Sequence, residues 1–369
     1  MTRGAPRRRS HPANLRPTLT DVAREAGVSV MTVSNFVRGK PVRVETRKTV
    51  GDAIARLNYR PNLSARSLRL SEEFSVGMVI ADTDPAFLND PFISRLVSGL
   101  SNFLSNLDYT LDLQGVDPGR FENATILRKI GNAALCAILC GPKTQRREHI
   151  EKLRKLDQPV VVFQETFQSP SDNVAIISQN DLSGGRQLAE HLLQKSIGTV
   201  WFVRPALQWC AVEQREKGLR ETFEKRKKPV QFTAMTAESE RFEDVEKVVA
   251  EGLATSVPDA IVGATDSMAV AALKACERAN LQVPSDLLVA GFNGFDACRY
   301  TSPTLTTIVS PAYDLGRCAG EVLIQRLRTG SFPRRSLVLP VHLQVADSTG
   351  GPSTRPVTAS RSERPHPRP

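Results

Sequence analysis

The sequence predicts a small all-α head followed by an α/β core built from parallel sheets. Within its first 70 residues lie three short helical patterns that are dense in arginine. From about Phe74, strand-like and helical runs alternate, which is the pattern of βαβ units. The length of 369 residues leaves room for two or three domains with a substantial core.

The first two helical patterns form a pair. The first covers about Asp21–Ala26 with Thr20 as its cap, Gly27 begins the turn that follows, and Ser29 caps the second helix. Helical spacing places Val33, Phe36 and Val37 on the buried face of the second helix. On the opposite face it places Val30, Met31, Ser34 and Asn35. A helix-turn-helix inserts such an outward face into the major groove of DNA.

The third helical pattern closes the core of the head. It covers about Glu45–Leu57 and buries Val50, Ile54 and Leu57 on one face. The helix ends before Pro61. Residues 62–68 permit a helix but are too few to form one alone, since an isolated helix needs about 12–15 residues for marginal stability in water. We expect this segment to become ordered only against a partner.

The run from Thr18 to Leu70 resembles the lactose-repressor/galactose-repressor family of bacterial transcription regulators. It matches the family's headpiece pattern TxxDVAxxAGVSxxTVS, its VxxxTR start of the third helix and its LNYxPNxxARSL hinge. Arg38 departs from the pattern, because Asn is common there. The resemblance implies a sequence-specific regulator, a repressor, that binds a near-palindromic operator in double-stranded DNA as a homodimer.

The resemblance also implies which residues contact DNA. Val30, Met31 and Asn35 are expected at base edges, and Leu68 is expected to wedge between base pairs from a hinge in the minor groove. Hydroxyl-bearing residues of the head are expected mainly at phosphates. The complete set of expected DNA-contacting residues is Thr20, Ser29, Val30, Met31, Thr32, Ser34, Asn35, Thr46, Tyr59, Asn62, Ala65 and Leu68.

The positive charge of the chain is confined to the head. The formal net charge is +10, and residues 1–70 hold fifteen Lys and Arg against four Asp and Glu, a net charge of +11. The rest of the chain therefore sums to −1. A basic region that coincides with the helix-turn-helix pattern is typical of phosphate contact.

The terminal segments and the cysteines favour a cytoplasmic bacterial protein associated with the nucleoid. Residues 1–17 are rich in Pro and Arg and lack the apolar stretch of a signal peptide, so we expect a disordered basic arm. The tail from Ser348 is rich in Pro, Ser and Arg and is also expected to be disordered. The six cysteines show no CxxC and no zinc-ligand spacing, which indicates buried free thiols. No stretch is apolar enough for a transmembrane helix.

The core sequence predicts eight strands separated by helices. The strand-like runs are Val76–Ala81, Thr110–Leu113, Ala137–Cys140, Val160–Phe163, Val174–Ile177, Thr199–Val203, Ala260–Gly263 and Leu288–Phe292. The helical stretches include Phe92–Leu107, Leu182–Leu193, Glu213–Arg226 and Ser267–Ala279. So many strands suggest two lobes of doubly wound parallel sheet, and the family resemblance implies the same: a core like that of periplasmic binding proteins, with a ligand cleft between the lobes.

These observations give the expected domain organisation. We expect a basic arm over residues 1–17, the helix-turn-helix headpiece over 18–61 and a hinge helix or linker over 62–71. A two-lobed effector-binding and dimerisation core follows over 72–347, and a tail over 348–369. Within the core, the chain is expected to cross between lobes near Ser178–Asn180 and again near Thr301–Thr307.

The resemblance carries a set of effector-binding residues onto the core. These are Phe92, Gln164, Arg215, Thr265, Asp266 and Asn293. Gln164 and Asn293 stand where many relatives have aspartate. Arg215 occupies the position of the arginine that commonly binds the effector in the family. An amide donates as well as accepts, and an arginine pairs with anions, so we expect a sugar, a sugar acid or a sugar phosphate as effector. No cofactor and no metal are expected.

Other classes of function account for less of the sequence. A regulator whose cleft is vestigial, and which needs no effector, remains an alternative. A solute-binding protein would share the core, but the head and the absent signal peptide oppose it. An enzyme is not expected, because the chain has no catalytic residues in GxSxG, GxxxxGK[ST] or HExxH patterns and no GxGxxG after a strand.

Because the basic residues are concentrated in the head, DNA binding should be strongly salt-dependent. We expect the logarithm of the association constant to fall with the logarithm of the salt concentration, by about 0.9 for each phosphate contact. Gel shifts on an operator duplex across a salt series measure this slope. An association constant that does not change with salt would contradict the assignment of the basic head to phosphate contact.

Overall fold

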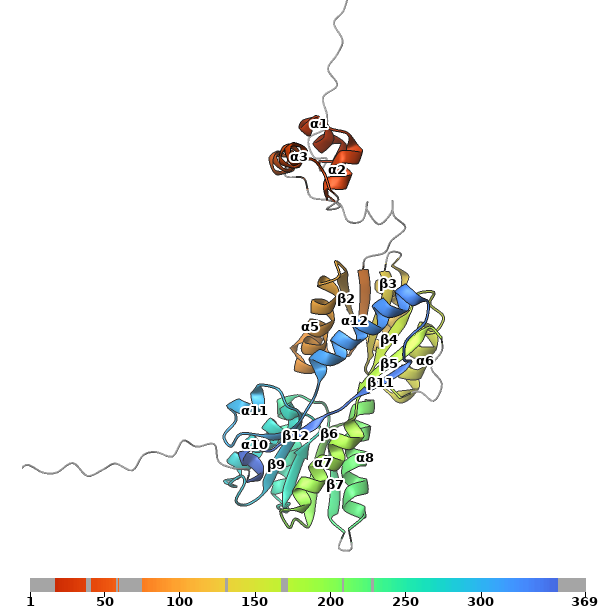
Figure 1. The fold of residues 1–369 in the computed structure, drawn as a ribbon. Coiled ribbons are helices and arrows are strands. Elements are labelled where there is room, and N and C mark those ends of the chain that lie inside the picture. The colour runs from red at the N-terminus through yellow and green to blue at the C-terminus, as the bar shows by residue number, and fades with distance from the viewer. Residues whose placement is uncertain are drawn as a thin grey trace, which may run out of the picture. The chain divides into compact units, whose positions relative to one another are not determined.

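A computed structural model describes residues 17–37, 41–57, 59, 75–129, 132–166, 172–207, 209–226 and 229–350. The chain divides into two compact units, residues 1–73 and 74–369. The expected hinge and nearly all of the expected arm and tail lie outside the described residues. Figure 1 shows the elements of both units.

The first unit contains three helices, α1 Leu19–Ala26, α2 Val30–Val37 and α3 Val44–Arg56. Their shared core consists of Val22, Ala23, Val33, Val50, Ala53 and Tyr59. The cap of α1 differs from the prediction. Thr18, not Thr20, caps it, because the Thr18 hydroxyl accepts a hydrogen bond from the Asp21 N–H while the Asp21 carboxylate accepts one from the Thr18 N–H. Ser29 caps α2 as predicted, since its Oγ accepts from the Thr32 N–H at 3.1 Å.

The second unit begins with a lobe built on a six-stranded sheet, here called the N-lobe. Its spatial order is β11-β5-β4-β3-β1-β2, and every pairing is parallel. The strands are β1 Ser75–Ala81, β2 Thr110–Val116, β3 Asn132–Leu139, β4 Val160–Phe163, β5 Val174–Gln179 and β11 Ser336–Leu339. The helices are α5 Pro91–Ser105, α6 Lys143–Leu153 and α12 Ala312–Thr329, with short 3-10 turns η1 Phe87–Asn89, η2 Pro118–Asn123 and η3 Thr125–Arg128. Two separate apolar clusters cover the sheet, and α5 and α12 belong to one of them.

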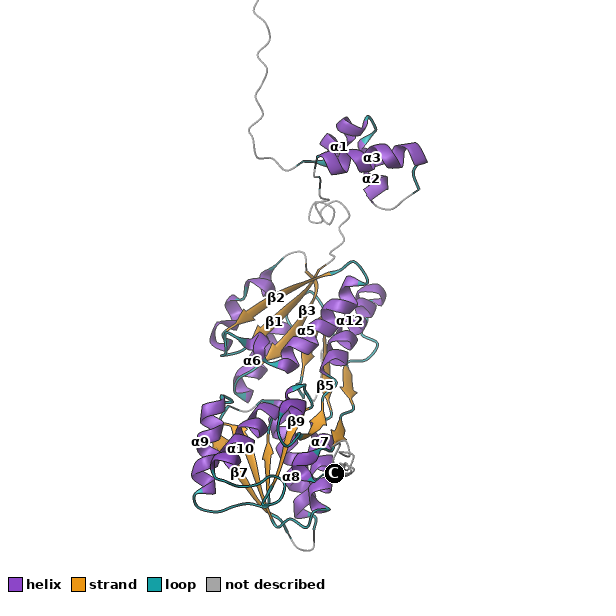
Figure 2. Cartoon of the chain, turned by 90° about the vertical axis from the view of Figure 1, so that its left-hand side faces the viewer, coloured by secondary structure: helices purple, strands orange, loops and turns teal. Residues whose placement is uncertain are grey.

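The other lobe, here called the C-lobe, holds a second six-stranded sheet in the order β12-β10-β9-β8-β6-β7, parallel except for β12. Its strands are β6 Thr199–Pro205, β7 Gln231–Ala237, β8 Ala260–Gly263, β9 Leu288–Asn293, β10 Thr306–Val309 and β12 His342–Gln344. Its helices are α7 Asp181–Leu193, α8 Cys210–Glu224, α9 Phe242–Leu253, α10 Asp266–Arg278, α11 Ala297–Tyr300 and the 3-10 turn η4 Asp347–Thr349. Figure 2 shows helices flanking both sheets, the layered arrangement that the alternating sequence predicts.

All eight predicted strands are present, and β4 and β8 have the predicted bounds. Four further strands, β7, β10, β11 and β12, were not predicted. They lie at or near sheet edges and carry polar residues, so they lack the continuous apolar run of a buried parallel strand. No described helix is long and apolar enough to span a membrane.

The chain passes between the lobes at three places. The first crossing lies between β5 and α7, as predicted. The second lies between β10 and α12, a few residues later than the predicted Thr301–Thr307, because Thr306–Val309 still forms a strand of the C-lobe. The third, between β11 and β12, was not predicted, since these two short strands give no apolar signal of their own.

Glycines bring α7 and α8 into close contact beside the first crossing. A Cβ added to Gly185 would lie 2.4 Å from the carbonyl oxygen of Arg215, and one added to Gly218 would lie 2.3 Å from that of Leu182. Only a residue without a side chain permits backbones to approach so closely. Gly185 and Gly218 therefore serve helix packing, and they hold Arg215 beside the start of α7.

The six cysteines are free thiols, as predicted, although only four are buried and Cys140 and Cys318 are partly exposed. Burial raises the pKa of the Cys136 thiol far above its usual value and that of Cys276 to about 11. These thiols remain protonated and pack as small apolar side chains.

Candidate functional site

The outward face of α2 is exposed in the head. Val30 is 38% exposed and Met31 67%, whereas Val33 on the opposite face is fully buried. Ser34 and Asn35 are half-buried beside them, and Ser29 and Thr32 share a hydrogen bond between their hydroxyls at 2.8 Å. Of the remaining predicted contacts, Thr20 is exposed and Thr46 is half-buried.

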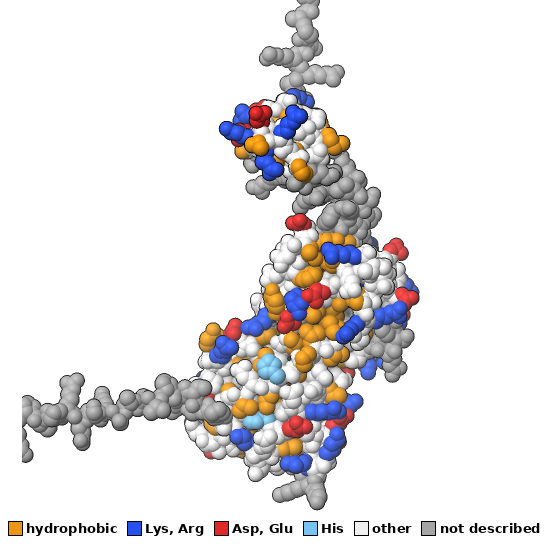
Figure 3. All heavy atoms as spheres, in the orientation of Figure 1, with side chains coloured by type: hydrophobic (Ala, Val, Ile, Leu, Met, Phe, Trp, Pro, Cys, Tyr) orange, Lys and Arg blue, Asp and Glu red, His pale blue; other side chains and the backbone are white. Residues whose placement is uncertain are grey.

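Basic side chains are exposed on the described part of the head. Arg24, Arg43, Arg47, Lys48 and Arg56 are all exposed. Figure 3 shows Lys and Arg side chains over the surface of the head. A head with both an exposed helix face and exposed cations has the groups that contact with a polyanion requires.

Tyr59, predicted to contact phosphate, is mostly buried in the head. Its side chain is 7% exposed and packs in the apolar core of the head. Tyr59 therefore contributes mainly to the stability of the head. The predicted hinge residues Asn62, Ala65 and Leu68 lie outside the described residues.

In the second unit, a buried ion pair lies where the lobes meet. The Arg215 side chain on α8 donates from Nε to Oδ1 of Asp181, the first residue of α7, at 2.8 Å. Arg215 is 2% exposed and Asp181 5%. The guanidinium also donates to the carbonyl of Ala264 at 2.7 Å and to Oδ1 of Asn293 at 3.1 Å, and it stacks on the ring of Phe292. Protein groups thus engage all three nitrogens of Arg215.

The same carboxylate ties Arg215 to the N-lobe. Asp181 accepts hydrogen bonds from the side-chain amides of Gln179 at 2.8 Å and of Gln164 at 3.3 Å. Gln164 in turn accepts from the backbone N–H of Gln179 at 2.9 Å. This network, here called the inter-lobe network, consists of Gln164, Gln179, Asp181, Arg215 and Asn293. It joins the ends of β4 and β5 in one lobe to α8 and the end of β9 in the other.

Two members of the inter-lobe network have unusual backbone conformations. Gln164 has a φ of 56° and Asn293 a φ of 122°, values that side chains with a Cβ rarely adopt. Both residues stand at the carboxyl ends of parallel strands, the edge at which open α/β sheets bind ligands. Such strain concentrates at functional sites.

Thr265 and Asp266 lie between the end of β8 and the first turn of α10. The two carboxylate oxygens of Asp266 accept hydrogen bonds from the Thr307 hydroxyl at 2.6 Å and the Phe295 N–H at 3.1 Å. Burial raises the pKa of Asp266, and the Thr265 hydroxyl caps α10 through the Met268 N–H. The structure thus gives Asp266, predicted to contact the effector, a role in fixing the loop after β9. The predicted Phe92 is half-buried at the start of α5 and packs on the N-lobe core.

Three further carboxylates, which were not among the predicted site residues, interact electrostatically with one another and with Arg215. Asp82 follows β1, Asp90 caps α5, and Glu240 follows β7 in the opposite lobe. The pKa of Glu240 is raised to about 8, first by desolvation and then by repulsion from Asp90, while Arg215 opposes the shift. The pKa of Asp90 is also raised, chiefly by desolvation. Strand β7 was not predicted, so the sequence did not show that Glu240 follows a strand of the C-lobe sheet.

The lobes also touch through an exposed ion pair. Arg95 on α5 donates to Asp296 at 3.0 Å and lies over the ring of Phe295 at 5.0 Å. Ser310 Oγ donates to Oε1 of Gln179 at 2.5 Å beside the crossing strands. These contacts join the two lobes in addition to the inter-lobe network.

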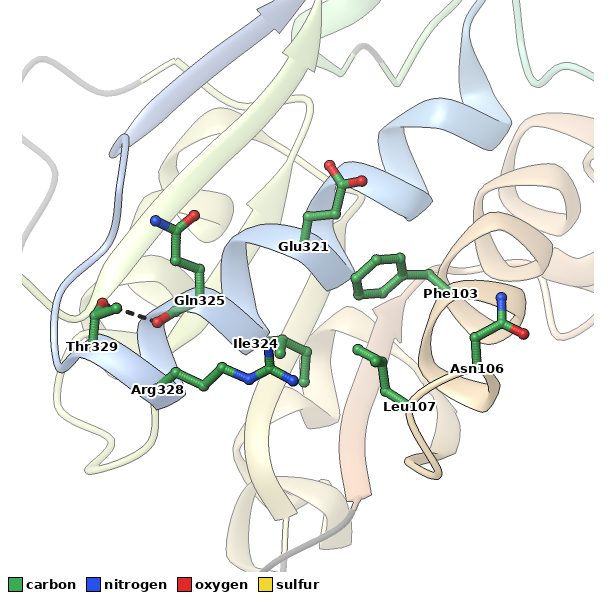
Figure 4. A pocket seen from close by; sticks show the side chains of 8 residues that line it. All are labelled: Phe103, Asn106, Leu107, Glu321, Ile324, Gln325, Arg328 and Thr329. Atoms are coloured by element: carbon green, nitrogen blue, oxygen red, sulfur yellow. Dashed lines mark hydrogen bonds between the residues drawn. The ribbon is translucent and has the colours of Figure 1, made fainter.

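A separate hollow of about 440 Å³ lies on the N-lobe, between the carboxyl-terminal halves of α5 and α12 (Figure 4). Its lining residues are Phe103, Asn106, Leu107, Glu321, Ile324, Gln325, Arg328 and Thr329. None of the effector-binding residues predicted from the sequence lines it. Its mixed apolar and charged lining provides no convergent set of polar groups.

Comparisons with known proteins match both units. Residues 18–62 match the model of the lacI family of bacterial regulatory proteins, and residues 189–349 match that of the periplasmic binding protein-like domain. Catabolite control protein A of Staphylococcus xylosus is 27% identical over 333 residues, 90% of this chain and 99% of that protein. The ribose operon repressor of Lactococcus lactis is 28% identical over 327 residues, 88% of this chain and 95% of that protein.

A solved structure has the same fold. The Lac repressor dimer bound to operator and the anti-inducer ONPF superposes with a TM-score of 0.75 at 24% identity, over 91% of this chain and 99% of that one. The likeness covers the head and both lobes, so the two-lobed architecture predicted from the sequence is confirmed.

The ion pair of Arg215 yields a stability prediction. Arg215→Ala leaves the Asp181 carboxylate buried without its cation, so we expect the free energy of unfolding to fall by about 3–5 kcal/mol. Adding Asp181→Asn should recover part of this loss, because the uncompensated charge is then gone. Urea unfolding followed by circular dichroism measures both.

Arg186→Ala provides the matched control. Arg186 pairs with Glu221 between the same two helices, but both side chains are partly exposed. Its removal should cost no more than about 1 kcal/mol. Equal losses for the Arg186 and Arg215 variants would show that burial does not set the strength of the Asp181–Arg215 pair.

Proposed function

We propose that this chain, whose head matches the model of the lacI family of bacterial regulatory proteins, is a transcription regulator, a repressor, whose operator affinity is set by a sugar or sugar derivative. The observation that carries the proposal is the pairing of a lacI-type head, whose α2 face is exposed, with a two-lobed core of the periplasmic-binding type. The protein acts as a homodimer on a near-palindromic duplex. Two of the curated relatives are named for catabolite control and for ribose operon repression.

In the head, we assign base contacts to Val30, Met31 and Asn35. Met31 is the most exposed apolar residue of α2, which suits contact with a thymine methyl group. The remaining head residues of the assigned interface contact phosphate or sugar: Thr20, Ser29, Thr32, Ser34 and Thr46. In the hinge we assign minor-groove contacts to Asn62, Ala65 and Leu68.

The domain organisation follows the same assignment. Residues 1–17 form the basic arm, 18–61 the head, 62–71 the hinge, 72–347 the core and 348–369 the tail. The bacterial chromosome lies in the cytoplasm, so we assign this transcription regulator to the cytoplasm. We assign it no catalytic role.

In the core, we place the effector against Gln164, Arg215 and Asn293, with Phe92 beside them. An effector that hydrogen-bonds Gln164 and Asn293 would compete for the groups that link the lobes through Asp181. Binding would then change the relative position of the lobes and, through the hinges, of the two heads of the dimer. Such coupling is typically worth about 1–3 kcal/mol in operator affinity.

Replacement of Met31 by Ala should change the preferred operator sequence. A base-edge contact carries about 1–3 kcal/mol of discrimination, so the half-site position that Met31 reads should lose its preference while the other positions keep theirs. Selection from a randomised duplex, followed by sequencing, measures the preference at each position. Thr49→Ala is the control, because its hydroxyl bonds the backbone of its own helix α3.

A second outcome would remove Met31 from the interface. If the wild type and the Met31 variant select the same half-site with the same strength, another part of the head reads the bases. If neither selects any sequence, the chain is not a sequence-specific regulator.

A further inference from the structure

We propose that Asp181 determines the ligand specificity of the inter-lobe site, because its carboxylate occupies Arg215 as an internal anion and so excludes ligands that carry a carboxylate or a phosphate. The inference rests on the proposed function, since it narrows the class of effector for the same site. Of the sugar, sugar acid and sugar phosphate that the sequence allows, it selects the uncharged sugar.

The guanidinium of Arg215 already has an acceptor at each of its nitrogens. Nε donates to Oδ1 of Asp181 at 2.8 Å. Nη1 donates to the carbonyl of Ala264 at 2.7 Å and Nη2 to Oδ1 of Asn293 at 3.1 Å. One face of the group lies over the ring of Phe292, 4.3 Å from its centre. An arginine that binds a ligand anion offers it free nitrogens in a planar fork, whereas Arg215 has no nitrogen without a protein acceptor.

The positive charge of Arg215 is also neutralised inside the protein. Among the described residues, Asp181 alone forms an ion pair with Arg215, and the two side chains are 5% and 2% exposed respectively. One buried cation with one buried anion carries no net charge. A ligand anion that entered beside this pair would be a buried charge without a partner, which is strongly unfavourable.

The surrounding structure holds the Asp181 carboxylate in place. Asp181 is the first residue of α7, and one turn later Gly185 packs on the backbone of Arg215, where an added Cβ would lie 2.4 Å from the carbonyl oxygen. The side-chain amides of Gln179 and Gln164 donate to the carboxylate at 2.8 and 3.3 Å. A ligand anion that displaced Asp181 would break the ion pair and both of these hydrogen bonds.

The amide of Asn293 leaves a donor for an uncharged ligand. Its Oδ1 accepts from Arg215, whereas its Nδ2 has no hydrogen-bond partner among the described residues. An amide N–H donates to a hydroxyl oxygen and requires no charge on the ligand. Gln164, whose Nε2 lies 3.3 Å from Asp181, is a second such group. A ligand with several hydroxyls therefore suits the site while the ion pair stays intact.

Removal of Asp181 should convert the ion pair into an anion-binding site. Asp181→Gly leaves Arg215 buried without its anion and opens a space of the size of acetate. We expect acetate to raise the midpoint temperature of unfolding of this full-length variant by at least about 2 °C at saturation, because acetate binds the folded state alone. Thermal unfolding across an acetate series, held at constant ionic strength with chloride, measures this rise.

Three controls assign the acetate effect to Arg215. The wild type should show no rise beyond that of Glu221→Gly, which breaks the partly exposed pair with Arg186 between the same two helices. Acetamide, which has the shape of acetate but no charge, should have no effect on Asp181→Gly. Asp181→Gly combined with Arg215→Met should not respond to acetate, since the cation is gone.

A second variant covers the case in which Asp181→Gly does not fold. Asp181→Ala disturbs the start of α7 less, since alanine has the highest helix propensity, and it leaves room for formate. If neither variant folds alone, recovery of the helical circular dichroism signal on addition of acetate or formate is the readout. An acetate effect of equal size in the wild type, Asp181→Gly and Glu221→Gly would overturn the inference.

Sugars test the specificity itself. Calorimetry would compare glucose, glucuronate and glucose 6-phosphate, and the same three forms of galactose and mannose, on the wild type and on Asp181→Asn. We expect the wild type to bind the neutral member of one series at least about tenfold more tightly than its uronate or phosphate. Asp181→Asn keeps the shape of the side chain but frees the charge of Arg215, so its affinity for the uronate should rise by a similar factor.

The outcomes separate this inference from the proposed function. A uronate or sugar phosphate that binds the wild type as tightly as the matching neutral sugar, and releases it from its operator, would overturn the inference and leave the regulator intact. If no sugar, acid or phosphate binds the wild type or alters its operator affinity, the effector-dependent function fails. The acetate experiment would still decide whether Asp181 is the internal anion of Arg215.

Discussion

The buried ion pair between Asp181 and Arg215 determines how the core of this protein is arranged. Asp181 is the first residue after the chain leaves the N-lobe, and Arg215 lies on the next helix, against which α7 packs through Gly185 and Gly218. A charge that is removed from water requires a partner with good geometry. Asp181 therefore holds the crossing strand, and Arg215 holds the end of β9, in one position relative to each other.

This arrangement affects the recognition of a ligand. The arginine is neutralised inside the protein, so its main contribution is to orient Asn293 and, through Asp181, Gln164. A ligand that binds Gln164 or Asn293 reaches the groups that connect the lobes, which gives ligand binding a direct route to lobe position.

The head depends on local interactions instead. Its helices are short, and the capping box of α1, the left-handed Gly27 and the Ser29 cap fix their ends within a few residues of sequence. One small apolar core, which includes Tyr59, then holds the three helices together. Contacts within the head itself thus set the position of the exposed α2 face.

The sequence by itself determined whatever depends on neighbours in the chain. Helical spacing gave the buried and exposed faces of α2, and the uninterrupted apolar runs gave β4 and β8 their bounds, because both strands are buried on both faces. The family motifs identified the head and located Gln164, Arg215 and Asn293. Polar edge strands such as β7 left no comparable signal.

Only the tertiary structure decided which charges meet. The sequence does not show that Asp181 pairs with Arg215, since the two residues are 34 positions apart and meet only when α7 packs against α8. Likewise, Tyr59 follows a polar turn in sequence but fills the core of the head. The sign and strength of an electrostatic site depend on distance and burial, and both are properties of the folded chain.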